Sequence, residues 1–285
     1  MMRTSPLLDV RLSADYRGRP NVLNHAEFQI DPGEVVGLVG ESGSGKSTIA
    51  LAILRLLEFR GGIARGEIRF GERNLVKLSE REMRGIRGRE IGLVLQSPLS
   101  SLNPAMRIGD QVFESWHAHR QSYSKRYCLS DALELLKTVS LPADAAFLNR
   151  YPRQLSVGQA QRVLIAMSIV HRPLLLIADE PTSALDAVTQ SEVLQLFSRL
   201  SRQLEMSILY ISHDLLSVAS ICSRVAILRE GQIVEFGSTG AIFREPRHSY
   251  TRGLIGSIPT IPARQPTHPF PTGATFSSIR PSPPP

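Results

Sequence analysis

The sequence predicts an α/β fold with a mostly parallel, doubly wound sheet and a phosphate-binding loop. Three observations carry this prediction. The apolar run at 35–39 is followed by a glycine-rich stretch at 40–48 and then by good helix formers at 49–57. After residue 155, apolar runs of strand length alternate with helical stretches. Polar side chains directly follow several of these runs, at the sheet edge where α/β folds bind ligands.

The stretch 40–48 stands in the order that a phosphate-binding loop requires, which is strand, glycine-rich loop and helix. Its glycines let successive N–H groups face a polyphosphate, and the helix that follows adds its positive N-terminal end. We expect Lys46 to reach the β- and γ-phosphates and the Ser47 hydroxyl to bind Mg²⁺. The loop residues expected to contact the nucleotide are Gly40, Ser42, Gly43, Ser44, Gly45, Lys46, Ser47 and Thr48.

Composition is that of an ordinary globular protein, with 42% hydrophobic and 21% charged residues in 285. No stretch approaches the roughly 18 consecutive apolar residues of a membrane helix. The N-terminus lacks the apolar core of a secretory signal, so we expect a cytoplasmic protein. The two cysteines, Cys128 and Cys222, are far apart in sequence and are interpreted as buried structural thiols.

The net charge of +7 and the pI near 9.8 could indicate a nucleic-acid partner. However, the basic residues are mixed with acidic ones, as in the stretch 81–90, and no basic stripe is interleaved with aromatic residues. We therefore interpret the excess charge as a solvated basic surface and expect no nucleic-acid partner.

Residues 7–30 carry two apolar runs divided by a turn-like segment at 17–20, which predicts an antiparallel hairpin or meander before the loop. Another short strand is expected at 67–71. The apolar run 91–95 predicts a buried strand that ends at Gln96.

From residue 97 to 158 the pattern changes to loops and helical stretches, which we interpret as a helical insertion in the α/β core. One helix is expected at 130–139, with Ser130 or Asp131 as its N-cap. A further helix, from 160 to 170, follows the segment 155–159.

The run 174–178 is apolar throughout, as in a strand buried on both faces of a parallel sheet, and it leads into Asp179 and Glu180. The remaining expected elements alternate between helix and strand, at 188–204, 207–211, 215–220 and 224–228. Residues 259–285 are rich in proline, serine and threonine, and we expect a disordered tail.

The polar residues at the strand ends suit phosphoryl transfer to water. Asp179 can hold Mg²⁺ together with Ser47. Glu180 is the candidate to polarise the attacking water. Gln96 is suited to bind Mg²⁺ or the attacking water, and His213 can hydrogen-bond the γ-phosphate. Together these residues predict ATP hydrolysis.

These motifs resemble those of the ATP-binding subunits of ABC transporters, over about residues 7–258. They correspond to the Walker A motif at 40–47, the Q-loop Gln96, the signature motif at 155–159, Walker B at 174–180, the D-loop at 183–186 and the switch residue His213. The resemblance implies a P-loop NTPase fold with a RecA-like, mostly parallel sheet. It also implies an N-terminal antiparallel β subdomain and an inserted α-helical subdomain at about 97–158, all within a nucleotide-binding domain spanning 1–258.

Three finer segments, 96–104, 177–182 and 248–252, are similar to the peptide/nickel importer subfamily. This resemblance implies an ATPase that uses ATP and Mg²⁺ at the cytoplasmic face of the inner (plasma) membrane. Its implied partners are two transmembrane permeases, a second ATPase subunit and an extracytoplasmic solute-binding protein.

In this family two ATPase domains close head to tail on two ATP molecules. The resemblance therefore implies that Ser156 and Gly158 of one chain face the γ-phosphate that the other chain holds. Gln159 and Asp186 are assigned to the nucleotide-binding set on the same ground.

The sequence departs from the family pattern in three ways. Val157 stands where the signature usually has glycine, and its branched side chain adds bulk and excludes glycine-only backbone angles. We expect the site that this signature completes to hydrolyse ATP slowly or only bind it, which favours a heterodimer over a homodimer. Tyr16 is the only nearby aromatic candidate to stack on adenine. The tail from Pro259 lacks the cysteines of the iron–sulfur segment in many oligopeptide importers, which weakens the case for that substrate.

The function that we predict is ATP-driven import of a peptide, nickel or a metal chelate. Two alternatives stay open. One is a non-transport ABC ATPase acting in DNA repair or on ribosomes, and the other is an exporter ATPase. The chain itself does not name the solute, because specificity in this family lies in the permeases and the binding protein.

Overall fold

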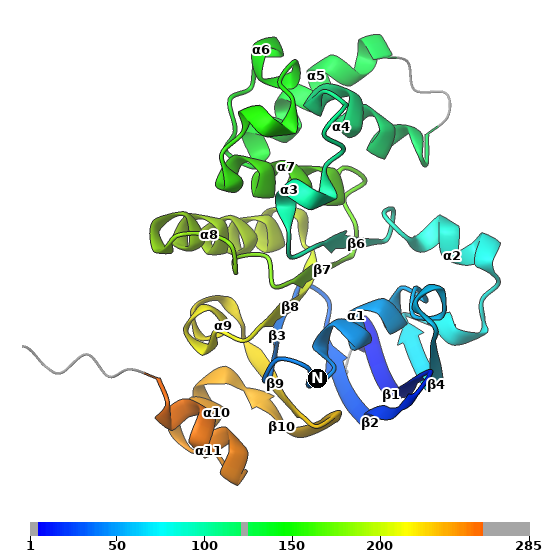
Figure 1. The fold of residues 1–285 in the computed structure, drawn as a ribbon, viewed down its shortest axis with the longest axis vertical. Helices are drawn as coiled ribbons and strands as arrows, with labels where there is room; N and C mark the ends of the chain where they lie inside the picture. The colour runs from blue at the N-terminus through cyan, green and yellow to red at the C-terminus, as the bar shows by residue number, and fades with distance from the viewer. Residues whose placement is uncertain (1–4, 121–124, 259–285) are drawn as a thin grey trace, which may run out of the picture.

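The structure is a computed structural model that describes residues 5–120 and 125–258 (Figure 1). Its strands are β1 (Leu8–Tyr16), β2 (Arg19–Ile30), β3 (Val35–Val39), β4 (Gly62–Phe70), β5 (Arg73–Asn74), β6 (Ile91–Val94), β7 (Leu175–Asp179), β8 (Ser207–Ser212), β9 (Arg224–Arg229) and β10 (Gln232–Ser238). Its α-helices are α1 (Lys46–Ile53), α2 (Glu80–Ile86), α3 (Pro98–Ser101), α4 (Ile108–His117), α5 (Lys125–Thr138), α6 (Ala145–Leu148), α7 (Val157–Ile169), α8 (Ala187–Leu204), α9 (Leu215–Ile221), α10 (Thr239–Arg244) and α11 (Ser249–Gly256).

The N-terminal strands form an antiparallel sheet of order β2-β1-β4-β5. Strands β1 and β2 are a hairpin whose register runs from Leu8 opposite Ile30 to Tyr16 opposite Arg19. β4 pairs antiparallel with the other edge of β1 and begins at Gly62, five residues before the expected start at 67. The hairpin expected before the loop is therefore present, and it belongs to a larger sheet.

The central sheet has the order β10-β9-β3-β8-β7-β6. Its β9, β3, β8, β7 and β6 run parallel, and β10 adds to the edge in the antiparallel sense. The side chains of β7 and β8 are buried almost throughout, because helices or the second sheet cover both faces. The predicted α/β class with a mostly parallel sheet is confirmed. Its parallel order places the carboxyl ends of β3, β6, β7 and β8 at one edge.

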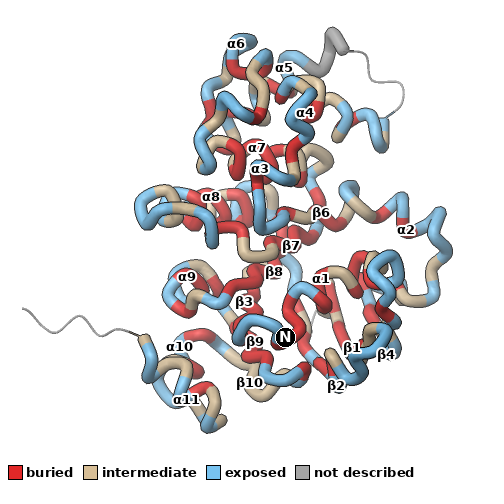
Figure 2. The backbone as a smooth tube through the Cα atoms, in the orientation of Figure 1, coloured by how far each residue is buried: buried red, intermediate tan, exposed pale blue. Residues whose placement is uncertain are grey.

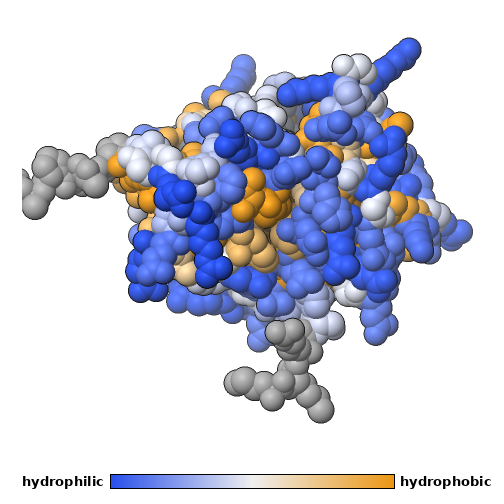
Figure 3. Space-filling model, turned by 90° about the horizontal axis from the view of Figure 1, so that it is seen from below, coloured by the Kyte–Doolittle hydropathy of each residue, from blue (hydrophilic) through white to orange (hydrophobic). Residues whose placement is uncertain are grey.

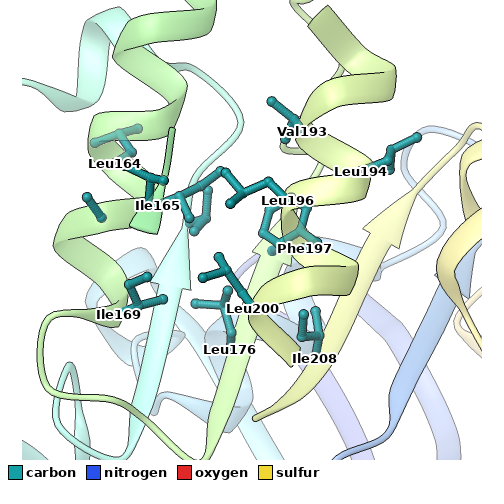
Figure 4. Close-up of a cluster of buried hydrophobic side chains, with 14 of the residues drawn as sticks. Leu164, Ile165, Ile169, Leu176, Val193, Leu194, Leu196, Phe197, Leu200 and Ile208 are labelled. Carbon is teal, nitrogen blue, oxygen red and sulfur yellow. The ribbon is translucent and has the colours of Figure 1, made fainter. Parts of the chain in front are cut away.

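Two hydrophobic clusters hold these layers together. Figure 2 shows the central strands β7 and β8, which lie between them, as buried. One lies between the antiparallel sheet, α1 and one face of the central sheet, and includes Phe28, Ile49 and Leu209. The other lies on the opposite face, where α7 and α8 pack over β7 and β8 (Figure 4). In that view Ile165 and Phe197 point from the two helices toward Leu176. This burial fixes the strand ends on which the site is built.

The segment that follows β6 is helical and occupies the top of the view in Figure 1. The predicted helix at 130–139 is present, but α5 extends from Lys125 to Thr138. The predicted N-cap was therefore wrong, because Ser130 and Asp131 lie inside the helix. Side chains that cap can also face outward in a helix interior, so residue type alone did not mark the start. α7 likewise begins at Val157, three residues earlier than expected, and Ser156 caps it.

No helix in the described ranges is long and apolar enough to cross a bilayer. The surface seen from below in Figure 3 is mostly hydrophilic, with small separate hydrophobic areas. Cys222 is buried as predicted, and burial raises the pKa of its thiol. The side chain of Cys128 and the predicted disorder of 259–285 lie outside the described part of the chain.

Candidate active site

The glycine-rich loop joins the end of β3 to the start of α1, as its sequence predicts. Gly45 precedes the helix with φ of 110°, a conformation that side chains with a Cβ rarely adopt. At Gly40 a Cβ would lie 2.2 Å from the carbonyl oxygen of Leu228, so neighbouring backbone excludes any larger residue there. The loop is thus a closely fitted concave backbone that opens onto the N-terminal end of α1.

Lys46 lies at the floor of this loop and is only 5% exposed. Its Nζ donates hydrogen bonds to the carbonyl oxygens of Gly40 at 2.8 Å and Glu41 at 2.9 Å. It also lies 4.0 Å from Glu180 Oε1. Burial lowers the pKa of the ammonium group, whereas the carboxylates of Glu180 and Asp179 act in the opposite direction.

Asp179 ends β7 and lies close to Ser47, and the two provide oxygen ligands suited to Mg²⁺. Asp179 Oδ1 is buried without a hydrogen-bond partner among the described residues. Burial raises the pKa of this carboxyl, and the nearby Ser47 hydroxyl acts against that rise. A buried carboxylate oxygen with no protein donor fits a metal ligand, because a cation would satisfy it. The residues present therefore fit Mg²⁺.

Glu180 stands at the centre of the polar groups that follow the strands. Its Oε2 accepts a hydrogen bond from Gln96 Nε2 at 3.0 Å and lies 3.3 Å from His213 Nδ1. Its backbone has φ of 46°, which is uncommon for a residue with a side chain, and its N–H donates to the carbonyl of Ile211 at 2.9 Å. The structure thus brings together the carboxylate, amide and imidazole that the sequence assigned to catalysis.

A pocket of about 490 Å³ opens over the loop. It is lined by Tyr16, Arg19, Val22, Ser42, Gly43, Gly45, Lys46, Ser47, Thr48, Gln96 and Glu180. Tyr16, the candidate for adenine stacking, lies with its hydroxyl 3.5 Å from Thr48 Oγ1. Sequence reasoning missed Arg19 and Val22, which reach the pocket because β2 folds back along β1.

The segment 155–159 does not line this pocket in the described chain, and neither does Asp186. Ser156 accepts from the N–H of Gln159 at 3.1 Å, and Gln159 Oε1 accepts from the N–H of Ser156 at 3.2 Å, a capping box that starts α7. Gly158 faces α8, where a Cβ would lie 2.6 Å from Thr189 Cγ2. Asp186 caps α8 and accepts from Thr189 Oγ1 at 2.7 Å. Segment 155–159 and Asp186, which were predicted to contact nucleotide, therefore lie together beside Thr189 and apart from the pocket. We call them the second unit.

Val157 is the first residue of α7 and is not among the described residues with positive φ. The start of α7 therefore uses an ordinary backbone conformation, in agreement with the statement that valine excludes glycine-only angles. It remains a prediction that the bulk of Val157 slows ATP hydrolysis at the site that this signature completes. The Val157 side chain is 37% exposed beside Ser156 and Gly158.

Sequence reasoning also missed a polar cluster that holds the residue following His213. Gln190 Nε2 on α8 donates to Asp214 Oδ2 at 2.8 Å and lies 2.7 Å from Ser217 Oγ. Ser217 also donates to Asp214, which caps α9. The cluster therefore fixes the loop that carries His213 to the first turns of α8, next to Asp186.

We expect Gln190→Ala to lower kcat for ATP hydrolysis about three- to tenfold with little change in KM, because the His213 loop loses its hold on α8. Steady-state kinetics on the assembled protein complex measure both constants. Gln195→Ala removes an exposed amide from the same helix and serves as the control. Equal kinetics for the two variants would show that the cluster does not position His213.

Two models of known protein families match the sequence of this chain. Residues 23–183 match the family model described as ABC transporter. The chain belongs to the ABC transporter family. Residues 234–279 match a second model, described as the oligopeptide/dipeptide transporter, C-terminal region. The recognition of this ABC subfamily from sequence motifs is thereby confirmed.

Relatives of the chain include ATP-binding proteins of bacterial transport systems. The chain is 44% identical over 266 residues to the oligopeptide transport ATP-binding protein OppD of Bacillus subtilis, covering 92% of this chain and 74% of that protein. It is 39% identical over 247 residues to the dipeptide transport ATP-binding protein DppD of the same organism, covering 86% and 73%. It is 40% identical over 259 residues to the glutathione import ATP-binding protein GsiA of Pectobacterium atrosepticum, covering 89% of this chain but 41% of that protein.

Solved structures of ABC cassettes share this fold. The dimeric post-hydrolysis cassette MJ0796 bound to ADP and Pi superimposes with a TM-score of 0.71 at 27% identity, covering 81% of this ABC chain and 98% of that one. CbiO1 from Clostridium perfringens, part of a cbiONQ transporter complex, gives a TM-score of 0.73 at 27% identity, covering 85% and 92%. The P-loop ATPase fold predicted from the motifs is confirmed.

Proposed function

We propose that this ABC ATPase powers the import of a peptide-type solute across the cytoplasmic membrane. The proposal of ATP hydrolysis rests on the position of Glu180, which lies between Lys46, Gln96 and His213 at the edge of the loop pocket. Import is supported by the match of residues 234–279 to a C-terminal region of oligopeptide and dipeptide transporters. Relatives whose names state peptide import and glutathione import also support import. Neither an exporter nor a non-transport ATPase is favoured by these findings.

The site suggests how each residue contributes. The loop N–H groups and Lys46 bind and orient the phosphates of ATP. Ser47 and Asp179 would hold Mg²⁺, with Gln96 as a further candidate ligand, and the ion neutralises charge on the phosphate oxygens when bound. Glu180 accepts a hydrogen bond from the attacking water and polarises it. His213 holds the Glu180 carboxylate on one side and, as its ring turns, can donate to the γ-phosphate.

The second unit, formed by segment 155–159 and Asp186, lies away from the chain's own pocket and is available to a partner. We propose that it completes the nucleotide site of a second ATPase subunit, and that this partner's corresponding segment completes the pocket over Lys46. The other proposed partners are two permeases and an extracytoplasmic solute-binding protein, with this chain at the inner face of the membrane.

We expect Val157→Gly to raise the ATPase rate of the assembled transporter, because the site completed by the segment 155–159 gains room at the γ-phosphate. The measurement is phosphate release at saturating ATP from wild-type and variant complexes. Val188→Gly, at another exposed valine, is the control for a general effect of losing a side chain in a first helical turn. An unchanged rate for Val157→Gly would remove this residue as the cause of a slow second site.

A single uptake experiment tests the import proposal and narrows the solute. Cells in which the gene is deleted, and then restored, are supplied with labelled di- and oligopeptides, glutathione and nickel ions. The proposal expects uptake of one of the peptide-type solutes to be lost on deletion and recovered on restoration. Unchanged uptake of all of them, or loss of nickel uptake alone, would contradict the proposed solute class.

A further inference from the structure

The C-terminal part of the described chain packs against the phosphate loop, although the two are far apart in sequence. Strand β9 lies next to β3, so the turn that leads into β10 reaches the loop (Figure 1). The N–H of Gly231 in that turn donates to the carbonyl of Ser44 at 3.1 Å. The carbonyl of Leu228 fills the space beside Gly40. The β9–β10 hairpin therefore supports the loop at both of its ends.

Helix α11 adds a side-chain contact to the same loop. The N–H of Glu41 donates to Tyr250 Oη at 3.3 Å, across 209 positions of sequence. The guanidinium of Arg229 lies over the Tyr250 ring, 5.0 Å from its centre. The ring also packs against the buried cluster on this side of the sheet. Arg229 and the buried cluster thus hold the Tyr250 ring, and its hydroxyl is directed to the loop.

The position of α11 is itself fixed by a carboxylate on β10. Glu235 accepts hydrogen bonds from the N–H of Arg247 at 3.0 Å and from the N–H of His248 at 3.1 Å. His248 caps the helix by accepting from the N–H of Tyr250 at 3.2 Å. A chain of hydrogen bonds therefore connects β10 to Tyr250 and onward to the loop.

The contact of Tyr250 with the loop also affects Lys46, because both side chains bind the same peptide group. The N–H of Glu41 and the carbonyl of Gly40 belong to one planar peptide group. Tyr250 binds the N–H of that group, and Lys46 Nζ binds its carbonyl oxygen at 2.8 Å. Rotation of this peptide group would move both partners. Tyr250 therefore limits the positions that the loop and Lys46 can adopt.

We propose that residues 228–258 form a C-terminal brace that positions the phosphate loop for nucleotide binding, with Tyr250 as its positioning residue. The brace deepens the function proposed above and rests on the same ATP site. The brace lies outside residues 23–183, which match the ABC transporter model, and most of it lies within residues 234–279, which match the C-terminal region model. The proposal gives this segment a role at the ATP site. A loop that is held before ATP arrives loses less conformational freedom on binding it.

The test compares MgATP binding by the purified full-length wild type, Tyr250→Phe and Ser249→Ala. Tyr250→Phe keeps the ring and removes the hydroxyl, whereas Ser249→Ala removes a neighbouring exposed hydroxyl from the same helix. The Kd is measured by titration calorimetry, and the thermal midpoint is measured without nucleotide. We expect the Kd of Tyr250→Phe to rise about two- to tenfold, with a midpoint within about 2 °C of wild type. Ser249→Ala should match wild type in both.

Two outcomes would overturn the brace. One is an unchanged Kd for Tyr250→Phe when wild type binds MgATP. The other is a raised Kd accompanied by a lowered midpoint, which would show a general loss of stability. Failure of wild type to bind MgATP would overturn the proposed function as well, so the failures of the two proposals are distinguishable.

Discussion

Replacing Glu180 with glutamine is expected to reduce ATP hydrolysis by about 10²- to 10⁴-fold, the range over which a positioned general base contributes. The amide keeps the size of the carboxylate but cannot take up a proton from water. MgATP binding should persist, because Lys46 and the loop N–H groups are unchanged. Phosphate release and nucleotide binding, measured on the same preparation, separate the two effects.

The control for this substitution is Glu134→Gln, which removes an exposed carboxylate on α5 that pairs with Lys137. It should leave hydrolysis at the wild-type rate. A Glu180→Gln variant that still hydrolysed ATP within about threefold of wild type would be incompatible with a general-base role.

Lys46→Met is expected to weaken MgATP binding about ten- to hundredfold, the second large effect. The methionine fills the buried space but supplies no charge and no donor to the phosphates. Binding of a fluorescent ATP analogue to the purified chain measures the change. Thermal unfolding without nucleotide checks that the variant folds, because Lys46 also bonds to Gly40 and Glu41.

Lys137→Met removes a lysine from the exposed surface of α5 and serves as the matched control, with no expected change in nucleotide affinity. The assignment of Lys46 to the phosphates fails if both variants bind the analogue as tightly as wild type.

Much of the fold could be predicted because its signals are local. The order of strand, glycine-rich loop and helix from residue 35 onward depends on neighbouring residues, although α1 ends at Ile53 and not at 57. The fully apolar run before Asp179 is likewise a local signal. Parallel strands then bring Gln96, Glu180 and His213 together at one sheet edge, although 84 positions separate the first two. The expectation of a parallel sheet, without its strand order, was enough to place these side chains at the same edge.

The contacts that sequence reasoning missed depend on tertiary packing. Gln190 meets Asp214 only because α8 and α9 lie side by side, and Tyr250 meets Glu41 only because β9 pairs with β3. No motif marks the first pair, and the segment 248–252, which resembles the importer subfamily and includes Tyr250, does not indicate the contact with Glu41. The start of α5 was misplaced for a related reason, since a residue that can cap a helix also occurs within one.

The measurement that tests the central claim most directly is solute uptake by membrane vesicles that contain the assembled transporter, with phosphate release recorded in the same sample. The account predicts that wild type accumulates the labelled solute only with MgATP, and that Glu180→Gln abolishes both accumulation and phosphate release. Accumulation at the wild-type rate by Glu180→Gln would contradict the claim that hydrolysis at this site powers import.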